Sequence, residues 1–128
     1  MPLTWEVLHP DRLVIATLEG QVAYRDLEGF IAALSAEGAI PYGKLFDTRR
    51  GSSALTESEL MSYTGMAAGY ASTAPLGPVA LVVAPKAAPD DATLRRLAII
   101  PRAFAIFYDI DDARRWLERQ VASAPPAP

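Results

Sequence analysis

The chain has 128 residues, of which 51% are hydrophobic, and its formal net charge at pH 7 is −3. This length and composition predict one globular domain that can bury its own core. The slightly acidic balance argues against a nucleic-acid-binding protein, because neutralising phosphates requires a clustered basic face. The chain has no cysteine, which excludes disulfides, thiol catalysis and cysteine-ligated metal centres.

No targeting or membrane-spanning segment is expected. The first ten residues, MPLTWEVLHP, lack the basic and apolar regions of a secretory signal, so we expect a cytoplasmic protein. The stretch from Leu60 to Pro85 carries no charge and is longer than the roughly 20 residues of a membrane helix. Because Pro75, Gly77 and Pro78 interrupt it, this stretch is interpreted as a helix, a turn and a buried strand.

The first third of the chain predicts a hairpin and a helix. Residues Leu3–Leu8 alternate between apolar and polar, as in a half-exposed edge strand, and a turn at His9 leads into the apolar strand LVIATLEG. A helix is expected from Tyr24 to about Glu37, where Gly38 ends it. Its apolar face is formed by Leu27, Phe30, Ile31 and Leu34.

Strands and helices alternate along the remainder. After the strand KLFDT, Thr56 and Glu59 have the spacing of a capping box that opens a helix running to about Thr73. The strand PVALVV precedes a helix that stops before Pro101, and the strand FAIFY leads to a last helix capped by Asp111. We expect one domain over residues 1–121 and a disordered Pro/Ala-rich tail over 122–128.

The resulting order, β-β-α-β-α-β-α-β-α, is typical of an α/β fold. Strands that are apolar on both faces and alternate with helices predict a mostly parallel sheet of four to five strands. The first strand is expected to lie antiparallel at one edge of this sheet.

In open sheets of this kind, ligands bind outside the carboxyl ends of the strands. The loops expected there are Asp47–Thr56, Ala84–Asp91 and Asp109–Asp112. The first is the richest chemically, because it combines two arginines and two serines with a helix start that favours negative charge. Its candidate anion- or partner-binding residues are Arg49, Arg50 and Thr56, and its candidate phosphoacceptors are Ser52 and Ser53. The alternative is a solvated link between a strand and a helix, with Thr56 as its cap.

The sequence gives little support for an enzyme. His9, the one histidine, is expected in the hairpin turn, away from the serines of the Asp47–Thr56 loop, so a Ser/His/acid triad is not predicted. The aspartates 109, 111 and 112 are interpreted as helix caps and first-turn acids rather than metal ligands. We therefore expect no catalytic residue, cofactor or metal.

The predicted helix after Thr56 is unusual because neither of its faces beyond the first turn is charged. A helix without a charged face is covered by something. Gly65 and Gly69 leave a shallow strip that another backbone can approach, and Met61 and Met66 are adaptable contact residues. The helix is either buried within its own chain or forms an interface with a second copy or a partner.

This arrangement resembles the STAS (anti-sigma-factor antagonist) fold, in particular its SpoIIAA-like branch. The stretches that carry the resemblance are LVIATLEG with YRDLEGFIAAL, KLFD with the serines that follow it, PVALVV, and AFAIFYDIDDARRWLE. The resemblance implies a phosphorylatable serine in the loop after KLFD and a partner kinase that contacts this loop and its helix. The family pattern there is close to Asp-Ser-Ser/Thr-Gly, whereas here Arg50-Gly51 precedes the serines and Ala54-Leu55 follows them. The branch is also related to lipid-binding Sec14-type domains, which implies a small amphiphilic ligand.

Two hypotheses follow. The first is a non-catalytic regulatory or protein-binding module, homodimeric, that uses the Asp47–Thr56 loop and the uncharged helix. The alternative is a domain that binds a small lipophilic or anionic ligand. That alternative predicts an enclosed apolar cavity lined by residues such as Met66, Tyr70 and Phe107.

Overall fold

The computed structural model describes residues 2–53, 56–72, 76–87, 90–98, 100 and 102–123. These residues form five strands, four α-helices and one short 3₁₀ helix. In chain order they are β1 Leu3–Leu8, β2 Leu13–Val22, α1 Tyr24–Ala36, β3 Gly43–Ser53, α2 Glu57–Ala71, β4 Val79–Val82, η1 Pro85–Ala87, α3 Asp91–Ala98, β5 Phe104–Phe107 and α4 Ile110–Ser123.

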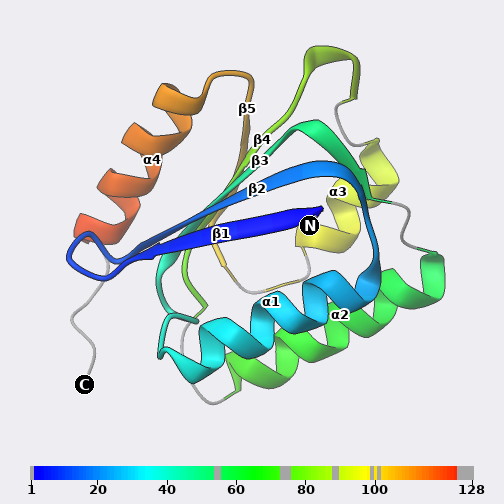
Figure 1. Cartoon of the computed structure of the whole chain (residues 1–128), viewed down its shortest axis with the longest axis horizontal. Helices are drawn as coiled ribbons and strands as arrows, with labels where there is room; N and C mark the ends of the chain where they lie inside the picture. The colour runs from blue at the N-terminus through cyan, green and yellow to red at the C-terminus, as the bar shows by residue number, and fades with distance from the viewer. Residues whose placement is uncertain are drawn as a thin grey trace.

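The five strands form one sheet in the order β1-β2-β3-β4-β5. β1 pairs with β2 in the antiparallel sense, and every later pair is parallel. Figure 1 shows α4 on one face of the sheet and α1, α2 and α3 on the other. The predicted α/β fold, with an antiparallel first strand at the edge, is therefore confirmed.

Each face of the sheet has its own core. Under α1 and α2 the core contains aromatic side chains, and Phe30 contacts both Trp5 and Phe46 edge-on at ring distances of 5.1 and 5.5 Å. Such edge-to-face contacts add to the free energy gained by burial. Under α4 the core is aliphatic, formed by Leu13, Leu45, Ala80, Val82, Ala113 and Leu117.

The helix α1 follows its sequence pattern closely. Phe30 and Leu34, from the predicted apolar face, are fully buried. The carboxylate of Asp26 accepts a hydrogen bond from the backbone N–H of Ala23 at 2.8 Å, which satisfies a donor at the helix start. Gly38 takes a left-handed φ of 69° just after the helix, as a C-terminal glycine does.

The capping box of α2 is also confirmed, but α2 packs unlike the other long helices. The Thr56 hydroxyl accepts from the N–H of Glu59 at 3.1 Å, and the Glu59 carboxylate accepts from the N–H of Thr56 at 3.0 Å. Every described residue of α2 keeps part of its surface exposed, whereas α1 and α4 each bury two residues completely. The helix ends at Ala71 with Ser72 as its C-cap, and Thr73, its expected end, lies outside the described residues.

The largest difference from the sequence-based prediction is the length of β3. Residues 47–53 continue the strand instead of forming a loop, because β2 extends equally far and pairs with them as far as Val22 and Ser53. The register shifts between Thr17 and Glu19, where β3 carries an extra residue. A Cβ at Gly51 would lie 2.6 Å from the Cβ of Leu18, so only glycine permits this close approach. Residues 54 and 55 lie outside the described residues.

The last helix begins slightly earlier than predicted. The side chain of Asp109, not Asp111, caps α4 by accepting from the N–H of Asp112 at 3.0 Å. Asp111 instead lies in the first turn, where a negative charge is also favourable. The helix continues to Ser123, and the rest of the predicted tail, 124–128, lies outside the described residues.

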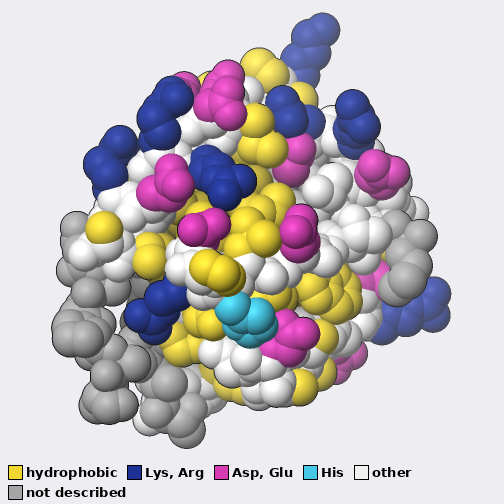
Figure 2. Space-filling model, turned by 60° about the vertical axis from the view of Figure 1, so that its left-hand side comes forward, with side chains coloured by type: hydrophobic (Ala, Val, Ile, Leu, Met, Phe, Trp, Pro, Cys, Tyr) yellow, Lys and Arg dark blue, Asp and Glu magenta, His cyan; other side chains and the backbone are white. Residues whose placement is uncertain are grey.

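The surface over α4 carries charges of both signs. Figure 2 shows Lys and Arg side chains interspersed with Asp and Glu on this face, without a large area of one sign. A basic face for a nucleic-acid backbone is therefore not found on this side of the molecule.

Candidate functional site

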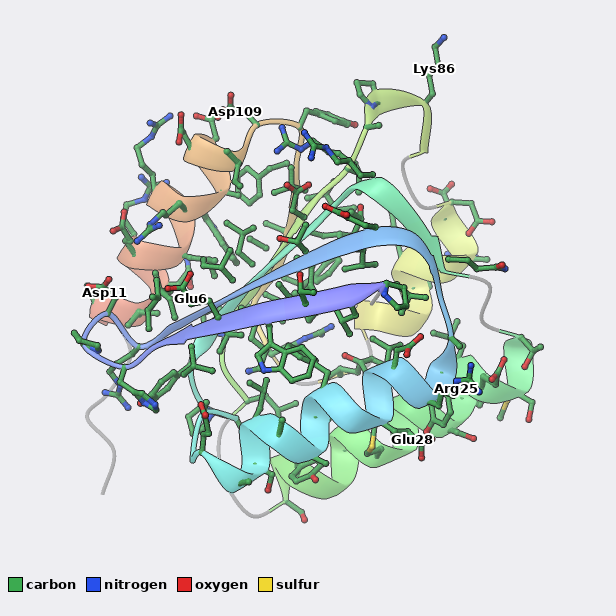
Figure 3. The ribbon with its side chains drawn as sticks, in the orientation of Figure 1. Glu6, Asp11, Arg25, Glu28, Lys86 and Asp109 are labelled. Atoms are coloured by element: carbon green, nitrogen blue, oxygen red, sulfur yellow. The ribbon has the colours of Figure 1, made fainter. Side chains whose placement is uncertain are left out.

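The carboxyl ends of β3, β4 and β5 form the edge where the sequence predicted a site. Figure 3 shows Lys86 and Asp109, which follow β4 and β5, at this edge of the sheet. At the same edge Arg49 forms a two-pronged pair with Asp47, from Nε and Nη2 to the two carboxylate oxygens, at 2.9 Å each. The hydrogen bond from the Arg49 side chain holds the pKa of Asp47 below its ordinary value. Arg49 must therefore release Asp47 before it can bind another anion with this geometry.

The other candidate residues of this edge are less closely associated. Arg50 and Thr56 are exposed, and the Thr56 hydroxyl is engaged in capping α2. The backbones of Ser52 and Ser53 pair with Gln21 and Val22 of β2, while their side chains lie outside what the structure describes. The structure thus joins Arg49 to Asp47, but it does not show a formed anion site around the serines.

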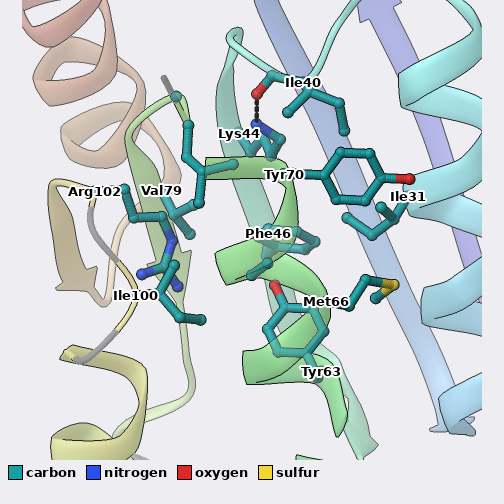
Figure 4. Close-up of a pocket in the computed structure, with 13 residues that line it drawn as sticks. Ile31, Ile40, Lys44, Phe46, Tyr63, Met66, Tyr70, Val79, Ile100 and Arg102 are labelled. Carbon is teal, nitrogen blue, oxygen red and sulfur yellow. Dashed lines mark hydrogen bonds between the residues drawn. The ribbon is translucent and has the colours of Figure 1, made fainter. Parts of the chain in front are cut away.

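The outer face of α2 is exposed and uncharged. Met61 is 66% exposed, and Gly65 and Gly69 lie on the same outer side. A Cβ built on either glycine has no neighbour within 4 Å, so no described part of the chain approaches this strip. The alternative that α2 is enclosed within its own chain does not hold for the described residues. Met66, by contrast, points inward (Figure 4).

A cavity lies between the inner face of α2 and the sheet. Its free volume is about 40 Å³, a few times what one ordered water needs. It is close to the amino ends of β3 and β4, where Lys44 and Val79 lie, and not at the carboxyl edge. The described part of the walls is mostly apolar and contains no Asp or Glu. The described lining residues are Ile31, Ile40, Lys44, Phe46, Tyr63, Met66, Ala67, Tyr70, Leu76, Gly77, Val79, Ile100 and Arg102.

Lys44 is the most unusual of these lining residues. It is only 5% exposed, and its Nζ donates a hydrogen bond to the carbonyl oxygen of Ile40 at 2.5 Å (Figure 4). The same Nζ donates a second hydrogen bond to the carbonyl oxygen of Tyr42 at 2.9 Å. Burial, and secondly the positive charge of Arg102, lower the pKa of Lys44 to about 7. Burial thus favours the neutral amine far more than it is favoured in an ordinary, exposed lysine.

Arg102 and Tyr63 complete the polar part of the cavity. The guanidinium of Arg102 lies 5.2 Å from the centre of the Phe104 ring, a cation–π distance. Burial lowers the pKa of Arg102, which nevertheless stays charged at neutral pH. Burial raises the pKa of the Tyr63 hydroxyl, so this group remains a neutral donor.

The cavity agrees with the ligand-binding prediction in part. Met66 and Tyr70 line it as predicted, but Phe107 does not. Phe107 lies on the opposite face of the sheet, where its ring is 5.7 Å from that of Trp116. This part of the prediction was wrong because β5 was treated as apolar on both sides without assigning its faces.

Sequence reasoning missed Lys44 and Arg102. Lys44 at the start of a strand has the pattern of a solvent-facing residue, and Arg102 follows a proline in an expected connection. The available signal was the strand alternation, because Lys44 and Phe46 must share a face of β3. That alternation places a lysine on a core-facing side of the sheet.

Among the described residues no helix is long and apolar enough to cross a membrane. Within that same part of the chain, no group of three or more His, Cys, Asp or Glu side chains converges as a metal site would require.

The sheet order, the antiparallel first strand and the placement of the helices define a SpoIIAA-like α/β fold, as the sequence predicted. The solved structures that share this fold include two at low sequence identity. One is an uncharacterized protein of the DUF3478 family with a SpoIIAA-like fold from Shewanella loihica PV-4, with a TM-score of 0.61, 18% identity, and coverage of 90% of this chain and 91% of that one. The other is the anti-sigma factor antagonist SpoIIAA in its unphosphorylated form, with a TM-score of 0.54 and 16% identity. That match covers 89% of this chain and 96% of the SpoIIAA chain. No protein-family model and no curated protein matches the sequence.

Proposed function

We propose that this protein is a non-catalytic binding module that holds a small anionic amphiphile beneath α2. The observation that carries this function is the composition of the cavity: its described lining combines apolar walls with two basic side chains and contains no carboxylate. Apolar walls with a few placed polar groups are typical of small-molecule sites. The SpoIIAA-like resemblance to lipid-binding domains points in the same direction.

The two basic groups have different parts in binding. Arg102 supplies a permanent positive charge for a carboxylate or a phosphate. Lys44, whose pKa is lowered to about 7, takes up a proton when an anion binds beside it, because the anion stabilises the ammonium form. Affinity for the anion should therefore fall as the pH rises above neutrality.

The free volume of about 40 Å³ is small for an aliphatic chain, so binding requires α2 to move away from the sheet. The packing of α2 makes such a movement inexpensive in free energy. None of its described residues is fully buried, and elements with few buried contacts open most readily.

Calorimetric titration of the whole chain with octanoate, octyl phosphate and octanol tests this function. Both anions should bind, and octanol should bind about tenfold more weakly, because it lacks the charge that Arg102 contacts. The two anions distinguish a carboxylate from a phosphate head. Equal affinity for octanol and the anions, or no binding of any of them, would overturn the assignment.

Adjacent alanines on α2 provide a matched pair of variants. Ala67 lines the cavity, whereas Ala68 is exposed. Ala67→Leu should fill the cavity and abolish binding, and Ala68→Leu should leave it unchanged. Arg102→Met should weaken binding of the anions about tenfold without affecting octanol, with Arg25→Met on exposed α1 as its control.

The second candidate function is protein contact through the outer face of α2, in a homodimer or with a regulatory partner. Two observations support this contact function: Met61 is highly exposed, and the strip at Gly65 and Gly69 is open. Phosphorylation of Ser52 or Ser53 near Arg50 would add negative charge beside the start of α2, where it is favourable. The regulatory role is implied by the resemblance to STAS antagonists. The serine motif of this chain departs from the pattern of that family.

Analytical ultracentrifugation of Gly65→Gln and Gly69→Gln tests the contact. The added side chains should weaken self-association if the strip is the dimer interface, while Gly29→Gln on α1, also open to solvent, should not. Mass spectrometry of protein from its native host reports phosphorylation. A monomeric, unphosphorylated wild-type protein that captures no partner would exclude this second function.

A further inference from the structure

The chain contains two lysines, and their surroundings are opposite. Lys44 is 5% exposed inside the cavity wall, whereas Lys86 is exposed and projects from the molecule after β4 (Figure 3). Among the described residues, no carboxylate lies within ion-pair distance of the Lys44 amine. A buried lysine without an acidic partner is costly to keep charged.

The number of hydrogen bonds that Lys44 donates equals the number that a neutral amine can donate. A neutral amine has two N–H bonds and one lone pair, and the carbonyls of Ile40 and Tyr42 accept two hydrogen bonds from Nζ. The fourth tetrahedral position is then left to the lone pair. A protonated amine would need a third acceptor, and none is found for it among the described residues.

Desolvation in an apolar site, next to another cation, is how proteins activate a lysine as a nucleophile. Both conditions are met at Lys44: the cavity walls are mostly apolar, and Arg102 lines the same cavity. The lowered pKa of Lys44 agrees with this geometry.

We propose that Lys44 is a nucleophilic amine that captures a small aliphatic aldehyde in this cavity as a reversible imine. The Nζ lone pair attacks the carbonyl carbon and forms the C–N bond, while a proton moves from nitrogen to the carbonyl oxygen and gives a carbinolamine. The C–O bond then breaks, and the oxygen leaves with a second proton from nitrogen as water. The net reaction converts amine and aldehyde to imine and water, with no oxidant or reductant. The apolar walls hold the alkyl chain.

This inference rests on the cavity that the proposed function uses, but not on binding of an anion. A bound anion should compete with the aldehyde, because it favours the protonated amine and occupies the same volume. Octanoate should therefore protect Lys44 from the aldehyde without protecting Lys86.

Reductive trapping tests the inference. The whole chain is incubated with butanal or hexanal and sodium cyanoborohydride between pH 6 and pH 9, and the modified lysines are located by peptide mass mapping. At pH 7 an ordinary lysine amine is neutral in only about one molecule in a thousand or fewer. Lys44 should therefore be alkylated at about ten times the rate of Lys86, despite its burial. In urea the two lysines should react alike.

Two variants make the outcome decisive. Lys86→Arg leaves Lys44 as the single lysine, so that the pH profile of labelling, with an expected midpoint near 7, belongs to one side chain. Ala67→Leu should suppress labelling of Lys44 and leave Lys86 unaffected. Labelling of Lys86 with Lys44 unmodified at pH 7 to 9, or unchanged labelling of Lys44 in Ala67→Leu, would overturn the inference. If octanoate binds while Lys44 is not labelled, only the imine fails; if Lys44 is labelled and no anion binds, only the proposed function fails.

Discussion

Gly77 lies directly against the backbone of Tyr42, so closely that a Cβ on Gly77 would overlap the Tyr42 carbonyl group. The N–H of Gly77 also donates to the carbonyl of Ile40 at 3.4 Å, and Lys44 donates to the carbonyls of both Ile40 and Tyr42. The segment between α1 and β3 is thus held from two sides, and this fixes the wall of the cavity.

Replacing Gly77 by alanine should destabilise the fold. The added methyl group meets backbone atoms, which cannot move aside as a flexible side chain can, and such overpacking costs about 1–3 kcal/mol. The free energy of unfolding, measured in urea, should fall by this amount. Gly29→Ala, where the new methyl group meets open space, is the control, and an unchanged transition midpoint for Gly77→Ala would contradict the packing.

The glycines of α2 should behave in the opposite way. A Cβ at Gly65 or Gly69 meets no atom within 4 Å, so alanine at either position should stabilise the monomer by up to about 1 kcal/mol through helix propensity. The measurement is again unfolding in urea, at a protein concentration low enough to exclude association. A loss of stability at low concentration would show that the strip is not open in the isolated chain.

Lys44→Met should alter the pH dependence of stability. The folded-state pKa of Lys44 is about 7, whereas a lysine in an unfolded chain titrates near 10.4. Between these two pKa values the unfolded wild-type chain binds more protons than the folded chain does. As the pH increases through this range, the free energy of unfolding of wild type should therefore rise relative to that of the variant, by roughly 1 kcal/mol per pH unit. Below about pH 7 the cost of the buried charge is fully present.

Urea unfolding at several pH values between 6 and 9 measures this difference. The two lost hydrogen bonds displace the curve of Lys44→Met by a constant amount and do not change its slope. Lys86→Met is the control for removing a lysine at an exposed site. Parallel curves for wild type and Lys44→Met would mean that Lys44 titrates as an ordinary lysine.

Asp47→Asn should weaken the fold at neutral pH and not in strong acid. Its charge-assisted hydrogen bonds with Arg49 hold the folded-state pKa of Asp47 below the ordinary value. The stabilisation is therefore present above the unfolded-state pKa and is lost as the pH falls through the folded-state pKa. The variant should lose about 1 kcal/mol at pH 7 and approach wild type as the pH falls below the folded-state pKa of Asp47, as followed by urea unfolding. Arg25→Gln on exposed α1 is the control.

Local patterns predicted the elements of this fold well. The apolar spacing that buries Phe30 and Leu34, and the capping box of Thr56 and Glu59, depend on neighbours within one helical turn or two. The length of β3 depends on β2, thirty residues earlier, and on a bulge that admits Gly51. The Arg, Gly and Ser residues in the second half of β3 have the composition of a loop. Pairing with β2 nevertheless holds this segment as a strand, so the long-range contact overrides the local preference.

The site was harder to predict than the fold for a related reason. The rule that places ligands at the carboxyl ends of strands directed attention to Arg49, Arg50 and the serines. The cavity lies at the other end of the sheet, because Lys44, Val79 and Arg102 are brought together by parallel pairing of β3, β4 and β5. Because these three residues are far apart along the chain, the hydrophobic periodicity of single elements could not predict that they lie together.

The incomplete burial of α2 has a consequence for how the molecule opens. Amide hydrogens of a helix exchange with deuterium once that helix detaches, and a helix with no fully buried residue detaches at a lower free energy than global unfolding requires. The amides of α2 should therefore exchange earlier than those of α1 and α4, in a partial opening that leaves the sheet intact and exposes Lys44 to solvent.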